Sequence, residues 1–332
     1  MKRSIFKRIL PLFVAALMLL AVGCSKSPVE GKNEDTAPDP VVIGEEPQTD
    51  SASVTHSSLY AVDGTTEESN GESYASDTAN VNTVLVENAG VLTMISADIN
   101  KTGDSSGDFS GGQNAAVAVL TKGQMTLNES NITTNGIGAV GMIVSGEGTQ
   151  LAVTGTSVYT SGESSPVIIV RDDASAMITS GALSTEGADS PGILLLGGRL
   201  TLTGVTLTSK SGEPLQVLAG DNFLTLDNTA VSAMSTFGEE ATLVLKLQNG
   251  ASFAGALGGT LPARASVHLD ATSKLILTAE TYLTALVNAD LTHANIESNG
   301  FNLYYDSSVV ENAYLNSQSF MLPGGGFLAP II

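Results

Sequence analysis

The sequence predicts an all-β fold, a single-stranded right-handed parallel β-helix with about 22–27 residues per turn. Two observations support this prediction. Short apolar-polar-apolar segments recur at a nearly constant interval through the middle of the chain. The composition has 35 Gly, no Trp, 5% aromatic residues and 14% charged residues. Many short strands joined by tight turns produce such a composition, whereas long helices do not.

The start of the chain has the zones of an export signal. Four basic residues precede an uncharged apolar stretch over 9–22, which is shorter than the roughly 20 residues needed to cross a bilayer. Gly23-Cys24 then resembles a bacterial lipobox, in which the Cys thiol is acylated, although Ala21 stands where Leu is more usual. We therefore expect a lipoprotein signal peptide over 1–23 and lipidation at Cys24, with an ordinary secretory signal as the alternative.

The segment after the lipobox is expected to be a flexible acidic linker over 24–58. It is rich in Ser, Pro, Asp, Glu and Thr and has few large apolar residues. Such a segment cannot bury enough apolar surface to offset the entropy lost on ordering. The linker would lift the folded domain off the membrane. Because Cys24 is the single cysteine, no internal disulfide is expected.

The repeat consists of six segments, each with an apolar-polar-apolar strand, a polar corner and one further apolar position. The segments begin at Leu92, Met125, Leu151, Met177, Leu200 and Leu224. Their last apolar residues are Ile99, Ile132, Val158, Leu183, Leu207 and Val231, with spacings of 33, 26, 25, 24 and 24. This regular spacing predicts that each segment stacks on the next one.

A further short strand precedes most segments, and a Gly-containing turn follows most of them. The preceding strands are expected over 116–120, 140–144, 167–170, 193–196 and 215–218, and the turn glycines are Gly136, Gly162, Gly187 and Gly212. Three such strands per turn would stack about 4.8 Å apart and bury a shared core, with Leu, Val, Ile and Met inward and Thr, Ser and Asn outward. An up-and-down barrel or a β-sandwich is the alternative, but hairpin folds give no reason for this period.

The β-helix is expected to span 59–322. A Ser-, Gly- and Asp-rich insertion over 103–112 lengthens the first interval and is expected to protrude from a corner. After residue 235 the repeat becomes less regular, and aromatic residues collect over 301–305. These aromatic residues would cap the open end of the stack. Residues 323–332 are expected to form a loosely ordered tail.

The segment 99–104, the insertion and Asn114-Ala115-Ala116-Val117 resemble the adhesin-like right-handed β-helix proteins of gut and anaerobic bacteria. The resemblance covers roughly residues 60–235 and includes the Gly-rich turns with Thr-Ser-Gly corners. Such proteins are often described as containing a carbohydrate-binding domain. The resemblance implies the fold, and it implies surface adhesion only weakly because no catalytic motif accompanies it.

Many β-helix proteins are polysaccharide lyases or hydrolases, which makes clustered acidic residues candidate catalytic groups. Asp172-Asp173 beside Arg171 is the one adjacent Asp pair after the linker. Neighbouring turns are expected to place Gly and Glu147 beside this pair, whereas hydrolases need aligned carboxylates. A solvated corner is therefore the preferred interpretation, and we predict no catalytic residue. Polysaccharide-lyase or glycoside-hydrolase activity remains the alternative.

No metal or cofactor site is predicted either. Asp104 and Asp108 in the insertion could bind Ca²⁺ together with backbone carbonyls, but their spacing does not fit an EF-hand, and the chain lacks the Gly-Gly-x-Gly-x-Asp calcium repeat. His56, His268 and His293 are scattered and lack the spacing of metal ligands. Trp is absent, and Tyr159 is the main aromatic candidate on a middle turn for stacking on a sugar, which counts against strong sugar binding. The outward Thr126, Thr201 and Thr225 favour a stabilising ladder over ice binding.

The net charge of −20 favours solubility and disfavours nucleic acid as a partner. Binding of cations or basic surfaces is the other interpretation of this charge. Taken together, the sequence predicts an exported, lipid-anchored protein of the cell membrane or outer surface. Its β-helix would bind a host, matrix or glycan ligand without catalysis. A purely structural envelope component is a third possibility.

Overall fold

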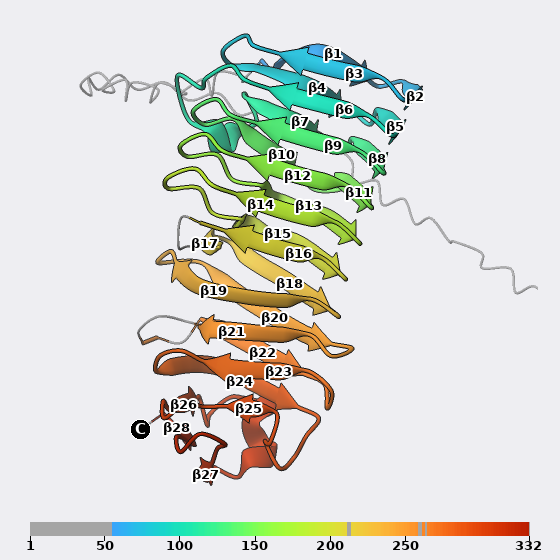
Figure 1. Ribbon diagram of the computed structural model, residues 1–332. Helices are drawn as coiled ribbons and strands as arrows, with labels where there is room; N and C mark the ends of the chain where they lie inside the picture. The colour runs from blue at the N-terminus through green and yellow to red at the C-terminus, as the bar shows by residue number, and fades with distance from the viewer. Residues whose placement is uncertain (1–54, 211–213, 258–260, 263, 332) are drawn as a thin grey trace, which may run out of the picture. The chain divides into compact units, whose positions relative to one another are not determined.

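The computed structural model describes residues 55–210, 214–257, 261–262 and 264–331. These residues form a parallel β-solenoid of about 11 turns. Figure 1 shows the turns stacked in chain order, from β1 in blue to β28 in red. The helices within the described residues are two short 3₁₀ segments, η1 (Phe109–Gly111) and η2 (Val310–Leu315). The all-β prediction is confirmed, whereas residues 1–23, Cys24 and most of the linker lie outside the described residues.

One face of the solenoid, here called sheet one, runs from β1 to the end of β19, and the described turns after β19 add no strand to it. Its strands are β1 (Ser57–Asp63), β4 (Val81–Glu87), β7 (Ala115–Leu120), β10 (Val140–Ser145), the first parts of β13 (Ile168–Thr179) and β15 (Ile193–Thr203), β17 (Leu215–Ala219) and the end of β19 (Ala230–Phe237). The strands predicted over 116–120 and 140–144 are β7 and β10, and the three later ones also lie on this face.

The second face, sheet two, runs through the described solenoid from end to end. Its strands are β2 (Thr66–Asn70), β5 (Val91–Ile95), β8 (Gln124–Asn128), β11 (Gln150–Thr154), the second parts of β13 and β15, β18 (Asp221–Asp227), β20 (Thr242–Gln248), β22 (Ala265–Leu269), β24 (Thr281–Asn288), β26 (Leu303–Tyr305) and β28 (Phe327–Pro330). Ladder pairing in parallel register aligns every second side chain on the inner face.

The third face, sheet three, contains the last strand of most predicted repeat segments. Its strands are β3 (Ser73–Ser76), β6 (Asp98–Lys101), β9 (Asn131–Thr134), β12 (Ser157–Thr160), β14 (Ala182–Thr185), β16 (Thr206–Ser209), the start of β19, β21 (Ser252–Ala256), β23 (Lys274–Leu277) and β25 (Ile296–Glu297). Ile99 pairs with Ile132, and Val158 pairs with Leu183. The predicted alignment of this face is confirmed.

The turns shorten where sheet one ends. Leu200 pairs with Leu224, and Leu224 pairs with Leu245. Fewer residues therefore separate the second pair in the sequence than the first. Among the residues that the structure describes, the later turns contribute strands to sheets two and three only. The less regular rungs expected after residue 235 are therefore parallel turns without a sheet-one strand in their described residues, and a register shift interrupts the ladder between β22 and β24.

A continuous apolar core runs through the stack. The inward column of sheet two is buried throughout and consists of Leu92, Met125, Leu151, Ala176, Leu200, Leu224, Leu245, Val267 and Leu286. A buried aliphatic side chain contributes roughly 1.5–3 kcal/mol, and no single turn contains enough of them to be stable alone. Stacking therefore holds the fold together.

Left-handed residues shape the corner between sheets two and three. Ser96, Glu129, Gly155, Ser180, Gly204 and Asn228 all have φ between 45° and 61°. The residue after several of these carries a hydroxyl that links two turns. Ser130 Oγ, for example, donates to Asn128 O at 2.8 Å and accepts the Ala97 N–H at 3.0 Å. Thr156 and Thr229 make the same pair of contacts further along.

Two details of the sequence prediction were wrong. Ala176, not Met177, pairs with Leu151 and faces the core, so Met177 points outward and is 52% exposed. The expected loose tail is part of the stack, because β28 pairs in parallel with β26 and antiparallel with β27 (Phe320–Met321). The expected cap near residues 301–305 is confirmed in part, since Tyr305 and Leu303 are fully buried.

Candidate functional site

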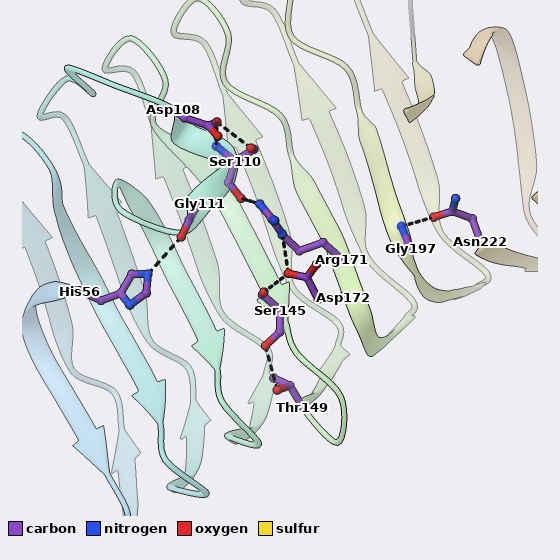
Figure 2. Close-up of polar contacts among 10 residues, drawn as sticks. All are labelled: His56, Asp108, Ser110, Gly111, Ser145, Thr149, Arg171, Asp172, Gly197 and Asn222. Carbon is purple, nitrogen blue, oxygen red and sulfur yellow. Dashed lines mark hydrogen bonds and ion pairs between the residues drawn. The ribbon is translucent and has the colours of Figure 1, made fainter. Parts of the chain in front are cut away.

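The acidic pair singled out in the sequence lies at the corner between sheets one and two. Asp172 and Asp173 have φ of 54° and 61°, and a register shift separates Arg171 from Ala174 there. Two consecutive left-handed residues turn the chain without ending β13. Asp172 Oδ2 accepts Arg171 Nε at 2.7 Å and Ser145 Oγ at 2.8 Å (Figure 2). The structure thus gives Asp172 a serine and an arginine as partners.

Arg171 also reaches the insertion, which lies far from it in sequence. Its Nη1 donates to the carbonyl oxygen of Ser110 at 2.6 Å. Nearby, His56 Nε2 donates to Gly111 O at 3.0 Å, and Asn82 Nδ2 donates to Gly112 O at 2.8 Å. Figure 2 shows Arg171 and His56 reaching η1 from separate turns. The insertion therefore does not protrude as expected, because polar side chains of the solenoid hold it.

An apolar cluster lies under this insertion on the outer side of sheet one. It consists of Leu85, Ala115, Ala118, Leu120, Val140, Ile143, Ile169 and Leu194, and all are buried. These side chains alternate with the inward ones, so without a cover they would face water. Phe109 of η1 packs against the cluster. Here the insertion has a structural task, which is to cover apolar surface.

The calcium candidates in the insertion have local partners. Asp104 Oδ1 accepts the Ile137 N–H at 2.8 Å in the next turn. Asp108 Oδ1 accepts the Ser110 N–H at 2.8 Å and thereby caps η1. Among the residues that the structure describes, no group of three or more His, Cys, Asp or Glu side chains could hold a metal ion.

A buried lysine lies at the base of the insertion. Lys101 is fully buried in β6, and its Nζ donates to Thr78 O at 2.8 Å. Burial lowers the pKa of this ammonium, and the nearby Asp104 and Asp77 oppose that shift. The hydrogen bond connects the turn before β4 with the start of the insertion. Lys101 therefore has a structural role.

The outer face of sheet two carries a first groove over β5, β8, β11 and β13. The groove has a volume of about 180 Å³. Gln124 and Gln150 pair in register along one side, and Met177 lies on the other. Ala152 pairs with Met177. Because the Ala152 side chain is small, it leaves the space that forms the groove. This groove is neutral, since no charged side chain lines it.

A second groove of about 470 Å³ lies further along the same face, over β20, β22 and β24. Its lining includes Lys246, Gln248, His268, Asp270 and Val287. Lys246 pairs with His268, and His268 pairs with Val287, so the three side chains form one outward column. Sequence reasoning missed this grouping because the later repeats could not be aligned.

Asp270 at the edge of this groove is fixed by hydrogen bonds. Burial alone would raise the pKa of its carboxyl. The backbone N–H of Asn249 and donors on Ser273 and Thr272 outweigh that effect and hold the pKa at about 2, below the usual 3.8. The Asn249 N–H lies 2.7 Å from Oδ2, and the Ser273 N–H lies 2.8 Å from Oδ1. Asp270 is therefore a charged group that joins two turns.

The aromatic candidate from the sequence has polar partners on the surface. Hydrogen bonds from Lys210 and then Tyr159 lower the pKa of the exposed Glu186, so Tyr159 belongs to a polar cluster on sheet three. Other aromatic contacts were missed. Tyr282 and Tyr304 stack with ring centroids 4.9 Å apart, and Arg199 lies 3.9 Å from the ring centre of Phe223. The register between adjacent turns creates both pairs.

The three histidines do not form a cluster within the described residues. His56 contacts the insertion, whereas His268 lines the second groove. His293 is buried beside Asn288. Burial lowers the pKa of the His293 ring, and the nearby Asp290 partly opposes that shift.

The outward Thr126, Thr201 and Thr225 share one column of sheet two, with Ala152 and Met177 between them. The expected Thr ladder is thus interrupted.

The described part of the chain contains no helix that is both long and apolar enough to span a membrane. No protein family, curated protein or solved structure matches this chain. The fold and its outer surfaces are therefore the basis for assigning a function.

Proposed function

We propose that the protein is a non-catalytic binding module whose β-solenoid displays the outer face of sheet two to a ligand. The supporting observation is that this face continues through every turn from β2 to β28 and carries two grooves. Gln, Thr, Lys and His side chains line these grooves, and such side chains bind polar ligands. The ligand class proposed is a glycan, with host or matrix proteins as the other candidates.

The module is proposed to be exported and held at the cell membrane or outer surface by lipid on Cys24. The support is the basic and apolar leader that ends in Gly23-Cys24. Several acyl chains would anchor it stably, because each buried CH₂ contributes about 0.8 kcal/mol. Metabolic labelling with a fatty-acid analogue should mark the wild-type chain and leave Cys24→Ser unlabelled. Labelling of Cys24→Ser to the same extent would contradict the anchor.

The binding proposal is tested with the soluble chain that starts after Cys24. It is applied to an array of neutral and acidic glycans and to immobilised matrix proteins. We expect retention on a subset of the glycans and no loss of glycan mass over time. A blank array, together with a changed cell surface on deletion of the gene, would instead support a structural envelope role.

Polysaccharide cleavage is the competing function, and Asp172 is the residue that separates the two. Its carboxylate already accepts from Arg171 and Ser145, so we propose that it stabilises the corner. The soluble chain should release no reducing ends or unsaturated products from acidic or neutral polysaccharides, with or without Ca²⁺. Turnover that disappears in Asp172→Ala would overturn the non-catalytic proposal.

A further inference from the structure

The second groove combines two side chains that can carry positive charge. Lys246 and His268 are direct neighbours on adjacent parallel strands, so their backbones are about 4.8 Å apart. Both side chains point outward and line the groove, Lys246 exposed and His268 half-buried. Within the described residues, neither side chain makes a hydrogen bond or an ion pair.

Most other described cations already have a partner. Arg171 pairs with Asp172, and Lys210 pairs with Glu186. Arg199 lies over Phe223, Arg264 donates to Gly238 O, and Lys101 donates to Thr78 O. Lys246 and His268 are therefore unusual in being adjacent, unpaired and placed in the same hollow.

The acidic groups beside this pair are occupied by other donors. Asp270 accepts from Asn249, Thr272 and Ser273. Asp227, one turn earlier, accepts Gln248 Nε2 at 2.8 Å and Asn249 Nδ2 at 2.9 Å. Neutral hydrogen-bond donors thus surround both carboxylates, which keep their negative charge, and neither carboxylate forms an ion pair with Lys246. An incoming anion would be the first charged partner for the Lys246–His268 pair.

We propose that this groove binds the carboxylate of an acidic sugar within a glycan chain. Lys246 and His268 would donate to the carboxylate oxygens, and charge-assisted hydrogen bonds of this kind are the stronger ones. The exposed Val287 offers an apolar contact to the sugar ring, and the side-chain oxygens of Gln248 and Asn249 can accept from hydroxyls. This inference rests on the proposed function, because it names the ligand class of the display surface.

The charge of the whole chain makes the test selective. With a net charge of −20, the protein repels anions at long range, so any affinity for an anionic sugar must come from local groups. The probe is a tetrasaccharide of mannuronate, with its methyl ester as the uncharged match. Binding to the soluble chain is measured by calorimetry at physiological salt, and by NMR of the His268 ring.

Three variants locate the site. Lys246→Gln removes the ammonium and His268→Gln removes the imidazole of the groove, whereas Lys274→Gln removes an exposed cation from sheet three and serves as the matched control. We expect the acid to bind at least about tenfold more tightly than the ester, and each groove variant to weaken it about tenfold. Lys274→Gln should leave binding unchanged. Equal binding of acid and ester, equal loss in all three variants, or no binding of the acid would overturn the proposal.

The same measurements separate this site from the proposed function. If the glycan array stays blank and the mannuronate probe leaves the His268 ring unchanged, the display function and this site both fail. If the array shows retention that Lys246→Gln and His268→Gln do not alter, the display function stands and this site is wrong.

Discussion

At the residue scale, stacked glycines set how closely the turns approach at the corner between sheets three and one. A Cβ added to Gly162 would lie 1.9 Å from Gly136 O, and one added to Gly187 would lie 1.7 Å from Gly162 O. Neither glycine has a positive φ, so the requirement is for space and not for backbone conformation. The carbonyl of each turn occupies the position that a side chain of the next turn would need.

We therefore expect Gly162→Ala to destabilise the solenoid by about 1–3 kcal/mol, the usual cost of overpacking. The added methyl group must push two turns apart. Thermal unfolding followed by circular dichroism measures the loss as a lower midpoint. Gly107→Ala is the matched control, because nothing lies within 4 Å of its added Cβ. Equal midpoints for the two variants would show that the corner tolerates a side chain.

Asp270 should give the stability a dependence on acidic pH. Its folded pKa of about 2 lies below the usual 3.8, so the folded state holds the carboxylate more strongly than the unfolded state does. The stabilisation is present above pH 3.8 and is lost as the pH falls towards 2. Asp270→Asn should flatten the change in unfolding midpoint over this range. An unchanged slope would mean that other carboxylates dominate it.

The sequence predicted the residues of the core well where side chains alternate clearly. The column of Ile99, Ile132 and Val158 was assigned correctly because each turn has a large apolar residue there. Met177 was misassigned because it is more apolar than Ala176, which occupies the core position. The register shift at Asp172 and Asp173 offsets the second part of β13 by one residue relative to the neighbouring strand. No local sequence pattern indicates this shift.

At the element scale, the insertion illustrates a long-range contact that sequence periodicity does not contain. Polar Ser, Gly and Asp residues suggested an exposed loop, and only the pairing of turns brings Arg171 and His56 to η1. The end of sheet one was equally hidden. The interval between paired residues shortens after Leu224, in the turn that still holds the last sheet-one strand, and the described turns after it add none, so the repeat no longer aligns.

Arg171 should act as the main polar anchor of the insertion. Replacing it with Gln removes the 2.6 Å hydrogen bond to Ser110 O, so the loop should open more often. We expect chymotrypsin to cut at Phe109 several times faster in Arg171→Gln than in the wild type. Lys210→Gln, which breaks an exposed ion pair elsewhere, should not change the rate. Equal rates for all three proteins would assign the anchoring to Phe109 and Asn82.

At the scale of the whole solenoid, each turn contacts only its neighbours, so the two ends need separate protection. At the first turn, Tyr60 and Tyr74 lie with ring centroids 5.0 Å apart and pack against the core. At the other end, the antiparallel pair β27 and β28 closes the stack, and Leu322 and Leu328 are buried there. Sequence composition indicated a cap near this end but not its hairpin.

Deletion of residues 317–332 should therefore expose a strand edge and part of the core. Leu328 pairs with Leu303, and Tyr305 donates to Gln318 O at 2.8 Å, so both contacts disappear with the hairpin. Unpaired backbone groups on β26 can then pair with another chain, and we expect dimers or larger species at micromolar concentration by light scattering. Met321→Ser removes a 73% exposed apolar side chain but keeps the hairpin, and it should stay monomeric. A monomeric, equally stable deletion variant would mean that η2 alone is a sufficient cap.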